Sequence, residues 1–137
     1  MRAVISVHGR FHAFELANGL FQRGCLQSLF TTYPAFIVNR LTASKLPVIS
    51  TPQLEIYRRL MAQVSLGFKT DLFISKTFGK FAAKQVELSG RGGVLIGWSS
   101  ATLEAIKPAH RLGKTVIIER GSTHIRDQAK ILRVAYS

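Results

Sequence analysis

The stretch AVISVHGRFHAFELANGLFQRGCLQSLFTT, residues 3–32, decides the fold. Its first five residues are rich in β-branched side chains without a helical period, which predicts a buried strand over 3–7 that ends at His8-Gly9. An apolar pattern with a 3.6-residue period follows and predicts an amphipathic helix, which Gly24 ends as a left-handed cap. The apolar face of that helix holds Ala13, Phe14, Leu16, Ala17, Leu20 and Phe21. Residues 26–32 predict a second strand, so the stretch predicts a strand–helix–strand unit.

The remaining sequence continues this alternation. Prolines at 34, 47 and 52 interrupt residues 33–52, which we expect to be a loop with one short strand near residues 36–38. Helices are expected over 53–66, 71–88 and 99–112 and from about residue 125, and strands over 93–97 and 114–119. Pro108 is expected to kink or split its helix. Strands that alternate with helices predict a Rossmann-like α/β fold, an open parallel sheet with helices on both faces.

Length and composition limit the class of protein. The 137 residues are enough for one folded domain, and the hydrophobic content of 47% is too high for a disordered chain. Lys and Arg total 19 against 7 Asp and Glu, and the net charge of +12 suits nucleic acid, anionic lipid or phosphorylated ligands. A single cysteine excludes an intramolecular disulfide framework. We see no export signal and no membrane-spanning stretch, so we expect a cytoplasmic protein.

Three loops that follow predicted strands carry the candidate functional residues. In open parallel sheets, ligands bind at the carboxyl ends of the strands, where helix amino termini offer free N–H groups. Each of the three loops combines a glycine with hydrogen-bond donors. They are His8-Gly9-Arg10-Phe11-His12, Gly97-Trp98-Ser99-Ser100 and Glu119-Arg120-Gly121-Ser122-Thr123-His124. We expect them to line one edge of the sheet.

Several of these residues could have a structural role instead of a functional one. Ser99 or Ser100 and Ser122 or Thr123 stand where helix N-caps belong, and a tryptophan such as Trp98 is more often a core residue than a ligand platform. A charged pair at the end of a buried strand is awkward for a core, so a functional role for Glu119-Arg120 is favoured over a structural ion pair.

Two other kinds of site are disfavoured by spacing. His8, His12 and Glu15 do not have the spacing of a one-face metal motif, so we expect no metal. Ser122, His124 and Asp127 are too close in sequence for a convincing catalytic relay, which argues against a hydrolase.

The expected helix over 71–88 carries a basic side. Lys69, Lys76, Lys80 and Lys84 project to one side with Phe73 among them. A basic face with an embedded aromatic can lie on anionic lipid, so Lys76, Lys80 and Lys84 are candidates for facing a membrane. A lysine face that only meets water is the more common explanation.

At the three loops the sequence resembles bacterial glycosyltransferases of family four (group 1), whose GT-B fold has two Rossmann-like halves across a cleft. The resemblance is carried by the opening strand, by HGRFHAFELANGLFQRG at 8–24, by Gly97-Trp98-Ser99 and by ERGSTH at 119–124. It covers nearly the whole chain in the family's order, and the ERGS-x-H segment is its most specific part.

The resemblance implies that residues 1–137 form the amino-terminal, acceptor-side half of such an enzyme. The family's carboxyl-terminal half binds the nucleotide sugar and carries an E-x7-E pattern, and no two glutamates here stand eight residues apart. We therefore expect a fragment that is inactive alone. By the same resemblance, sugar is transferred with retention from a nucleotide-sugar donor to a glycan or lipid-linked acceptor, without metal or other cofactor. Peripheral contact with the inner face of the cell membrane would then give Lys76, Lys80 and Lys84 a role.

The resemblance also suggests residue roles. Gly9 matches a loop glycine that approaches the donor sugar and phosphates, Arg10 and His12 flank it, and His124 is the best match to a histidine that contacts the donor sugar. The catalytic candidates are His124, Arg120 and Glu119, and the substrate-binding candidates are His8, Gly9, Arg10, His12, Trp98, Ser99 and Ser122. Arginines and loop N–H groups supply positive potential for a diphosphate leaving group. The alternative function is a stand-alone basic module for nucleic acid or anionic membrane; dispersed charge and the lack of a recognisable motif count against nucleic acid.

Overall fold

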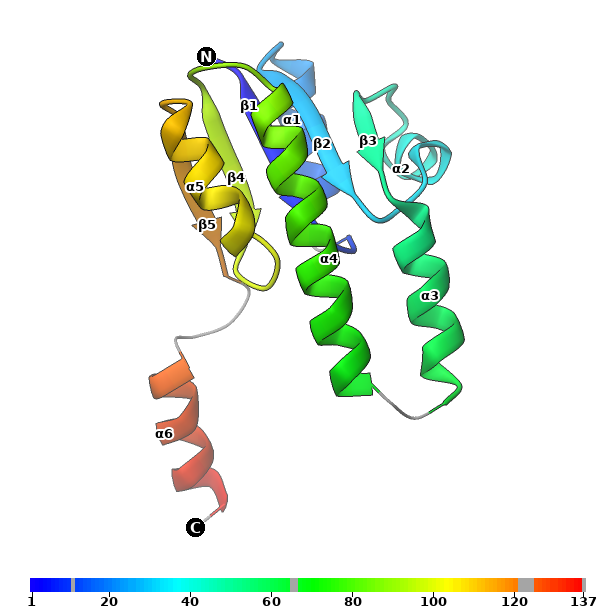
Figure 1. Cartoon of the computed structure of the whole chain (residues 1–137), viewed down its shortest axis with the longest axis vertical. Helices are drawn as coiled ribbons and strands as arrows, with labels where there is room; N and C mark the ends of the chain where they lie inside the picture. The colour runs from blue at the N-terminus through cyan, green and yellow to red at the C-terminus, as the bar shows by residue number, and fades with distance from the viewer. Residues whose placement is uncertain (11, 65–66, 121–124, 137) are drawn as a thin grey trace.

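The computed structural model describes residues 1–10, 12–64, 67–120 and 125–136. Five strands, all paired in parallel, form one sheet in the order β3-β2-β1-β4-β5. The strands are β1 (Ala3–Val7), β2 (Leu26–Thr31), β3 (Val48–Ser50), β4 (Val94–Trp98) and β5 (Thr115–Glu119). The helices are α1 (Ala13–Gln22), α2 (Ala35–Thr42), α3 (Pro52–Ala62), α4 (Gly67–Leu88), α5 (Leu103–Arg111) and α6 (Ile125–Tyr136) (Figure 1). The predicted Rossmann-like α/β fold is confirmed.

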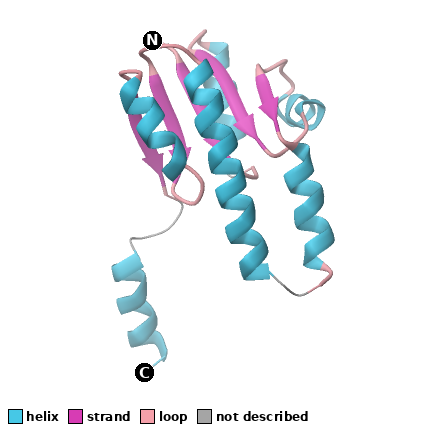
Figure 2. Cartoon of the chain, in the orientation of Figure 1, coloured by secondary structure: helices cyan, strands magenta, loops and turns pink. Residues whose placement is uncertain are grey.

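Helices cover both faces of the sheet. On one face, α3, α4 and α5 pack against the sheet in a core that includes Phe78, Val4 and Leu95. On the other face, α1 and α2 pack around Phe14 and Val38. Figure 2 shows this layered arrangement, with α4 in front of the strands. None of the helices in the described ranges is both long and apolar enough to cross a bilayer.

The opening strand–helix–strand unit forms as predicted. Gly24 has a φ of 69°, and its N–H donates to the carbonyl of Phe21 at 3.0 Å, so a left-handed glycine follows α1 and turns the chain toward β2. Not all of the predicted apolar face of α1 is buried against the sheet. Two of its residues, Leu16 and Phe21, are each 37% exposed.

The expectation of a loop over residues 33–52 is wrong. The segment forms α2, where the short strand was expected, and then β3. The prolines stand at the boundaries of these elements: Pro34 precedes α2, Pro47 precedes β3 and Pro52 is the first residue of α3. At the first position of a helix a missing N–H costs nothing, so a proline there starts the helix instead of breaking it.

Three helix boundaries also differ from the prediction. α3 ends at Ala62, earlier than expected, and α4 begins at Gly67, so Asp71 lies in its second turn. α5 begins only at Leu103 and continues through Pro108 without splitting. Ser99 and Ser100 are therefore not N-caps of this helix. The residue before α5 is Thr102, whose hydroxyl donates to the carbonyl of Trp98 at 2.6 Å.

Candidate functional site

A pocket of about 540 Å³ opens at the carboxyl edge of the sheet. Its walls come from the loops after β1, β2 and β4 and from the sides of α3 and α4. The lining residues are His8, Gly9, Arg10, Thr32, Glu55, Arg58, Asp71, Ile74, Ser75 and Ser100.

The pocket lies where the strand order reverses. From β1 the chain adds β2 and β3 on one side of the sheet and then returns to add β4 and β5 on the other. The loops after β1 and β4 therefore lead to helices on opposite faces, and the crevice between them is the general ligand position in open α/β sheets. The topology thus accounts for a pocket between His8 and Ser100, which are 92 residues apart in sequence.

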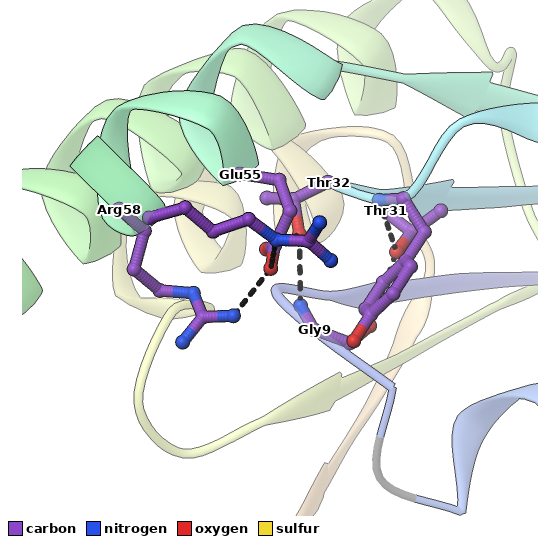
Figure 3. A network of polar contacts seen from close by, with 7 residues as sticks. Gly9, Thr31, Thr32, Glu55 and Arg58 are labelled. Atoms are coloured by element: carbon purple, nitrogen blue, oxygen red, sulfur yellow. Dashed lines mark hydrogen bonds and ion pairs between the residues drawn. The ribbon is translucent and has the colours of Figure 1, made fainter. Parts of the chain in front are cut away.

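A polar network joins several residues of the pocket lining to β2 and α3 (Figure 3). The N–H of Gly9 donates to the hydroxyl of Thr32 at 3.1 Å, and the hydroxyl of Thr31 donates to the carbonyl of Gly9 at 3.1 Å. The Thr32 hydroxyl in turn donates to Glu55 Oε2 at 3.4 Å. Gly9 has a φ of 86°, a left-handed conformation that favours glycine. The loop after β1 is therefore held to β2 and α3 before any ligand arrives.

Glu55 is a buried carboxylate at the centre of the network. Its side chain is 8% exposed and forms an ion pair and a hydrogen bond with Arg58 and an ion pair with Arg59 at 3.7 Å. The hydrogen bond to Glu55 raises the pKa of Arg58. Because a buried charge needs partners, Glu55 is satisfied by the protein itself. We assign it a positioning role.

His8 lines the pocket directly after β1. Its Nε2 lies 3.0 Å from the Ser100 hydroxyl, and its ring packs edge-on against Phe78 with the centroids 6.3 Å apart. Burial lowers the pKa of His8 below its usual value, against a smaller opposing effect of the Asp71 carboxylate. The imidazole is therefore neutral at pH 7 and has one nitrogen that donates and one that accepts.

The pocket is electrically balanced although the chain carries +12. Two cations, Arg10 and Arg58, and two carboxylates, Glu55 and Asp71, line it beside the neutral His8. Asp71 is exposed and forms no hydrogen bond or ion pair with other described residues, so its carboxylate is available to a ligand. With the hydroxyls of Ser75 and Ser100, the pocket offers several acceptors and donors for a neutral polar ligand.

The structure brings together only part of the predicted substrate-binding set. His8, Gly9 and Arg10 line the pocket, and His12 is exposed outside its lining. Ser99 is exposed beside the pocket-lining Ser100, and its N–H donates to the carbonyl of Glu119 at 3.1 Å.

Trp98 lies in the core. It is 4% exposed and belongs to the apolar cluster beneath α1 that contains Ile5 and Phe14. Side chains on a strand alternate between faces, and that of Trp98 is directed into the core and is not part of the pocket lining.

Glu119 and Arg120 stand at the end of β5, outside the pocket lining. Glu119 pairs in register with Trp98, so the carboxyl ends of β4 and β5 share an edge with that of β1, as predicted. Both residues are exposed, and no ion pair found within the described ranges joins them. The other predicted residues of that loop, Ser122 and His124, lie outside the described residues.

Sequence reasoning missed the wall that α3 and α4 contribute. It did not select Thr32, Glu55, Arg58, Asp71 or Ser75, and it included Ser100 in a candidate loop but chose Ser99 as the site residue. One usable signal was Thr32, the last residue of the strand predicted over 26–32, and another was the Glu55-x-x-Arg58 spacing on a predicted helix.

A scan against protein-family models and searches of curated proteins and of solved structures found no match. Within the described ranges, no group of three or more His, Cys, Asp or Glu side chains is arranged to hold a metal ion.

Proposed function

We propose that this chain is the acceptor-binding amino-terminal domain of a retaining glycosyltransferase, which moves a sugar from a nucleotide-sugar donor to a glycan or lipid-linked acceptor. The donor would be bound by a second Rossmann-like domain that faces the pocket. The observation that supports this best is a charge-balanced pocket at the reversal point of the sheet, lined by a neutral histidine, an exposed carboxylate and two serines.

The chemistry of the lining suits a sugar. A sugar presents many neutral hydroxyl groups, each of which donates and accepts hydrogen bonds. Asp71 supplies an acceptor, and Ser75, Ser100 and His8 supply groups of both kinds. Sites built to hydrogen-bond hydroxyl groups discriminate strongly against ligands that lack them, because buried polar groups would be left unpaired.

The same lining favours an acceptor over a nucleotide. The N–H of Gly9 already donates to Thr32, so it is not free to bind a phosphate, and Arg58 is paired with Glu55. Arg10 differs, because its side chain is 48% exposed and lies 3.5 Å from the exposed Glu15. Arg10 can therefore turn toward the diphosphate of a donor held by the facing domain. In this proposal Gly9 shapes the acceptor site instead of approaching the donor.

In the transfer step an acceptor hydroxyl attacks the anomeric carbon on the face from which the diphosphate leaves, so the configuration is retained. The bond from that carbon to the diphosphate oxygen breaks, and the proton of the hydroxyl passes to that oxygen as the nucleoside diphosphate departs. This domain's contribution is to orient the hydroxyl. Ser100, whose hydroxyl is held by His8 Nε2 at 3.0 Å, hydrogen-bonds the attacking hydroxyl, while Asp71 and Ser75 fix the acceptor's other hydroxyls. Correct orientation of two reactants is worth a large part of a reaction barrier.

Ligand-detected NMR tests the proposal. The chain is mixed in turn with simple glycosides and with nucleoside diphosphates, and binding is compared among the wild type, Ser100→Ala, Asp71→Asn and the matched control Ser99→Ala. We expect a glycoside to bind, with affinity lowered by about tenfold or more in the two pocket variants, because Ser100→Ala loses a hydrogen bond to the ligand and Asp71→Asn loses a charge-assisted one. Ser99→Ala should bind like the wild type.

Two results would contradict the proposal. One is binding of a nucleoside diphosphate with no binding of any glycoside. The other is a loss in Ser99→Ala as large as in Ser100→Ala, because Ser99 does not line the pocket.

A further inference from the structure

The outer face of α4 carries a set of exposed cations. α4 buries Ile74, Phe78, Ala82 and Val86, spaced four residues apart, against the rest of the domain. The opposite side, which we call the α4 outer face, consists of Lys69, Leu72, Phe73, Lys76, Lys80 and Lys84. All six are exposed, and Figure 1 shows α4 lying across the front of the sheet.

Two of these six residues are large and apolar. Leu72 and Phe73 are each 50% exposed, near the amino-terminal end of the helix. The Phe73 ring packs against Tyr57 of α3 with the centroids 5.1 Å apart. The packing holds an aromatic side chain at the surface between Lys69 and Lys76.

The outer face has almost no acidic residues to offset its lysines. Between Lys69 and Lys84 the sequence has one acidic residue, Asp71, and that residue lines the pocket on the other side of the helix. Farther along, Glu87 is bonded to Arg111 at 2.9 Å. A face that combines uncompensated lysines with an exposed leucine and phenylalanine matches the chemistry of an anionic bilayer surface.

We propose that the α4 outer face docks this domain on an anionic lipid bilayer. Leu72 and Phe73 enter the headgroup region, and Lys69, Lys76, Lys80 and Lys84 face the lipid phosphates. The opposite side of the same helical turns presents Asp71 and Ser75 to the pocket. The pocket therefore lies about one helix diameter, roughly 10 Å, from the membrane. This inference is independent of the glycosyltransferase proposal, because it requires no sugar ligand.

Vesicle sedimentation tests the electrostatic part. The chain is mixed with vesicles of phosphatidylcholine alone or with phosphatidylglycerol added. The variant is Lys76→Gln/Lys80→Gln/Lys84→Gln, and the control is Arg23→Gln/Arg40→Gln/Lys45→Gln, which removes three exposed positive charges beside α1 and α2 on the other face of the sheet.

We expect binding only to the anionic vesicles, a loss of roughly a hundredfold in the α4 variant, and a much smaller loss in the control. The hundredfold figure follows from about 1 kcal/mol for each lysine near an anionic surface. Equal losses in the two variants, or no vesicle binding, would overturn the proposal. It would also be overturned if the chain bound duplex DNA through these lysines and bound no vesicles.

Fluorescence quenching tests the insertion part. Phe73→Trp is compared with Phe36→Trp, since Phe36 is a 71% exposed phenylalanine of α2 on the other face. The native Trp98 is 4% exposed and is the same in both variants. Lipids brominated near the headgroups should quench the indole introduced by Phe73→Trp and leave the indole introduced by Phe36→Trp unaffected. Equal quenching of the two, or none, would contradict insertion at the α4 outer face.

Discussion

His8 lies in an environment that its type and position in the sequence do not suggest. A histidine after the first strand could have been an exposed, charged side chain, but it packs on Phe78 and reaches Ser100 across 92 residues of sequence. Burial favours its neutral form. This neutrality is what allows it to act as a hydrogen-bonding partner for a hydroxyl in a pocket that already contains two arginines.

The stability of the fold should therefore depend on the protonation of His8. Its pKa is lower in the folded chain than the usual value of 6.5, so as pH falls the unfolded chain takes up the proton first. The free energy of unfolding that the neutral His8 contributes above pH 6.5 is therefore lost as the pH falls below 6.5. Urea unfolding from about pH 7.5 to about pH 5.5 should show a larger loss in the wild type than in His8→Gln. Equal losses would mean that His8 is not desolvated as described.

At the scale of elements, Gly97 of β4 allows the loop that follows this strand to pack closely against it. A Cβ at Gly97 would overlap the Thr102 side chain, including its Cβ. Thr102 is 1% exposed and bonded to the Trp98 carbonyl, so it cannot move aside. This close approach precedes α5 and positions Ser100 on the pocket.

Gly97→Ala should therefore destabilise the chain by about 1–3 kcal/mol through overpacking. Gly19→Ala is the matched substitution, because Gly19 lies inside α1 and a Cβ there meets only Arg23 Nη1 at 3.7 Å. It should stabilise the chain by up to about 1 kcal/mol through helix propensity. Urea unfolding midpoints measure both. A neutral Gly97→Ala would show that the turn after β4 is looser than this packing requires.

Elements with strong local patterns were predictable, and elements decided by tertiary packing were not. The periodicity of residues 3–32 was sufficient for β1, α1 and β2 because burial and helical period agree there. Prolines read as helix and strand breakers predict a loop over residues 33–52, whereas Pro34 and Pro52 stand where helices begin.

At the scale of the molecule, the strand order organises the site. Alternating elements predicted a parallel sheet whose loops gather at one edge, and the carboxyl ends of β1, β4 and β5 do so. The sequence could not show that β1 and β4 are neighbours, and so could not favour Ser100 over Ser99 or exclude Glu119 and Arg120 from the lining. Nor could it show that α3 and α4 supply a wall of the pocket, because that depends on how the long connection between β3 and β4 packs on the face of the sheet.

The most direct test of the pocket's role is an amide chemical-shift map of the isotopically labelled chain, titrated with a glycoside that binds it. The largest shifts should fall on Gly9, Thr32, Ser75 and Ser100, which converge on the pocket from four separate segments. Largest shifts at Glu119 and Arg120, with the pocket amides unmoved, would contradict it.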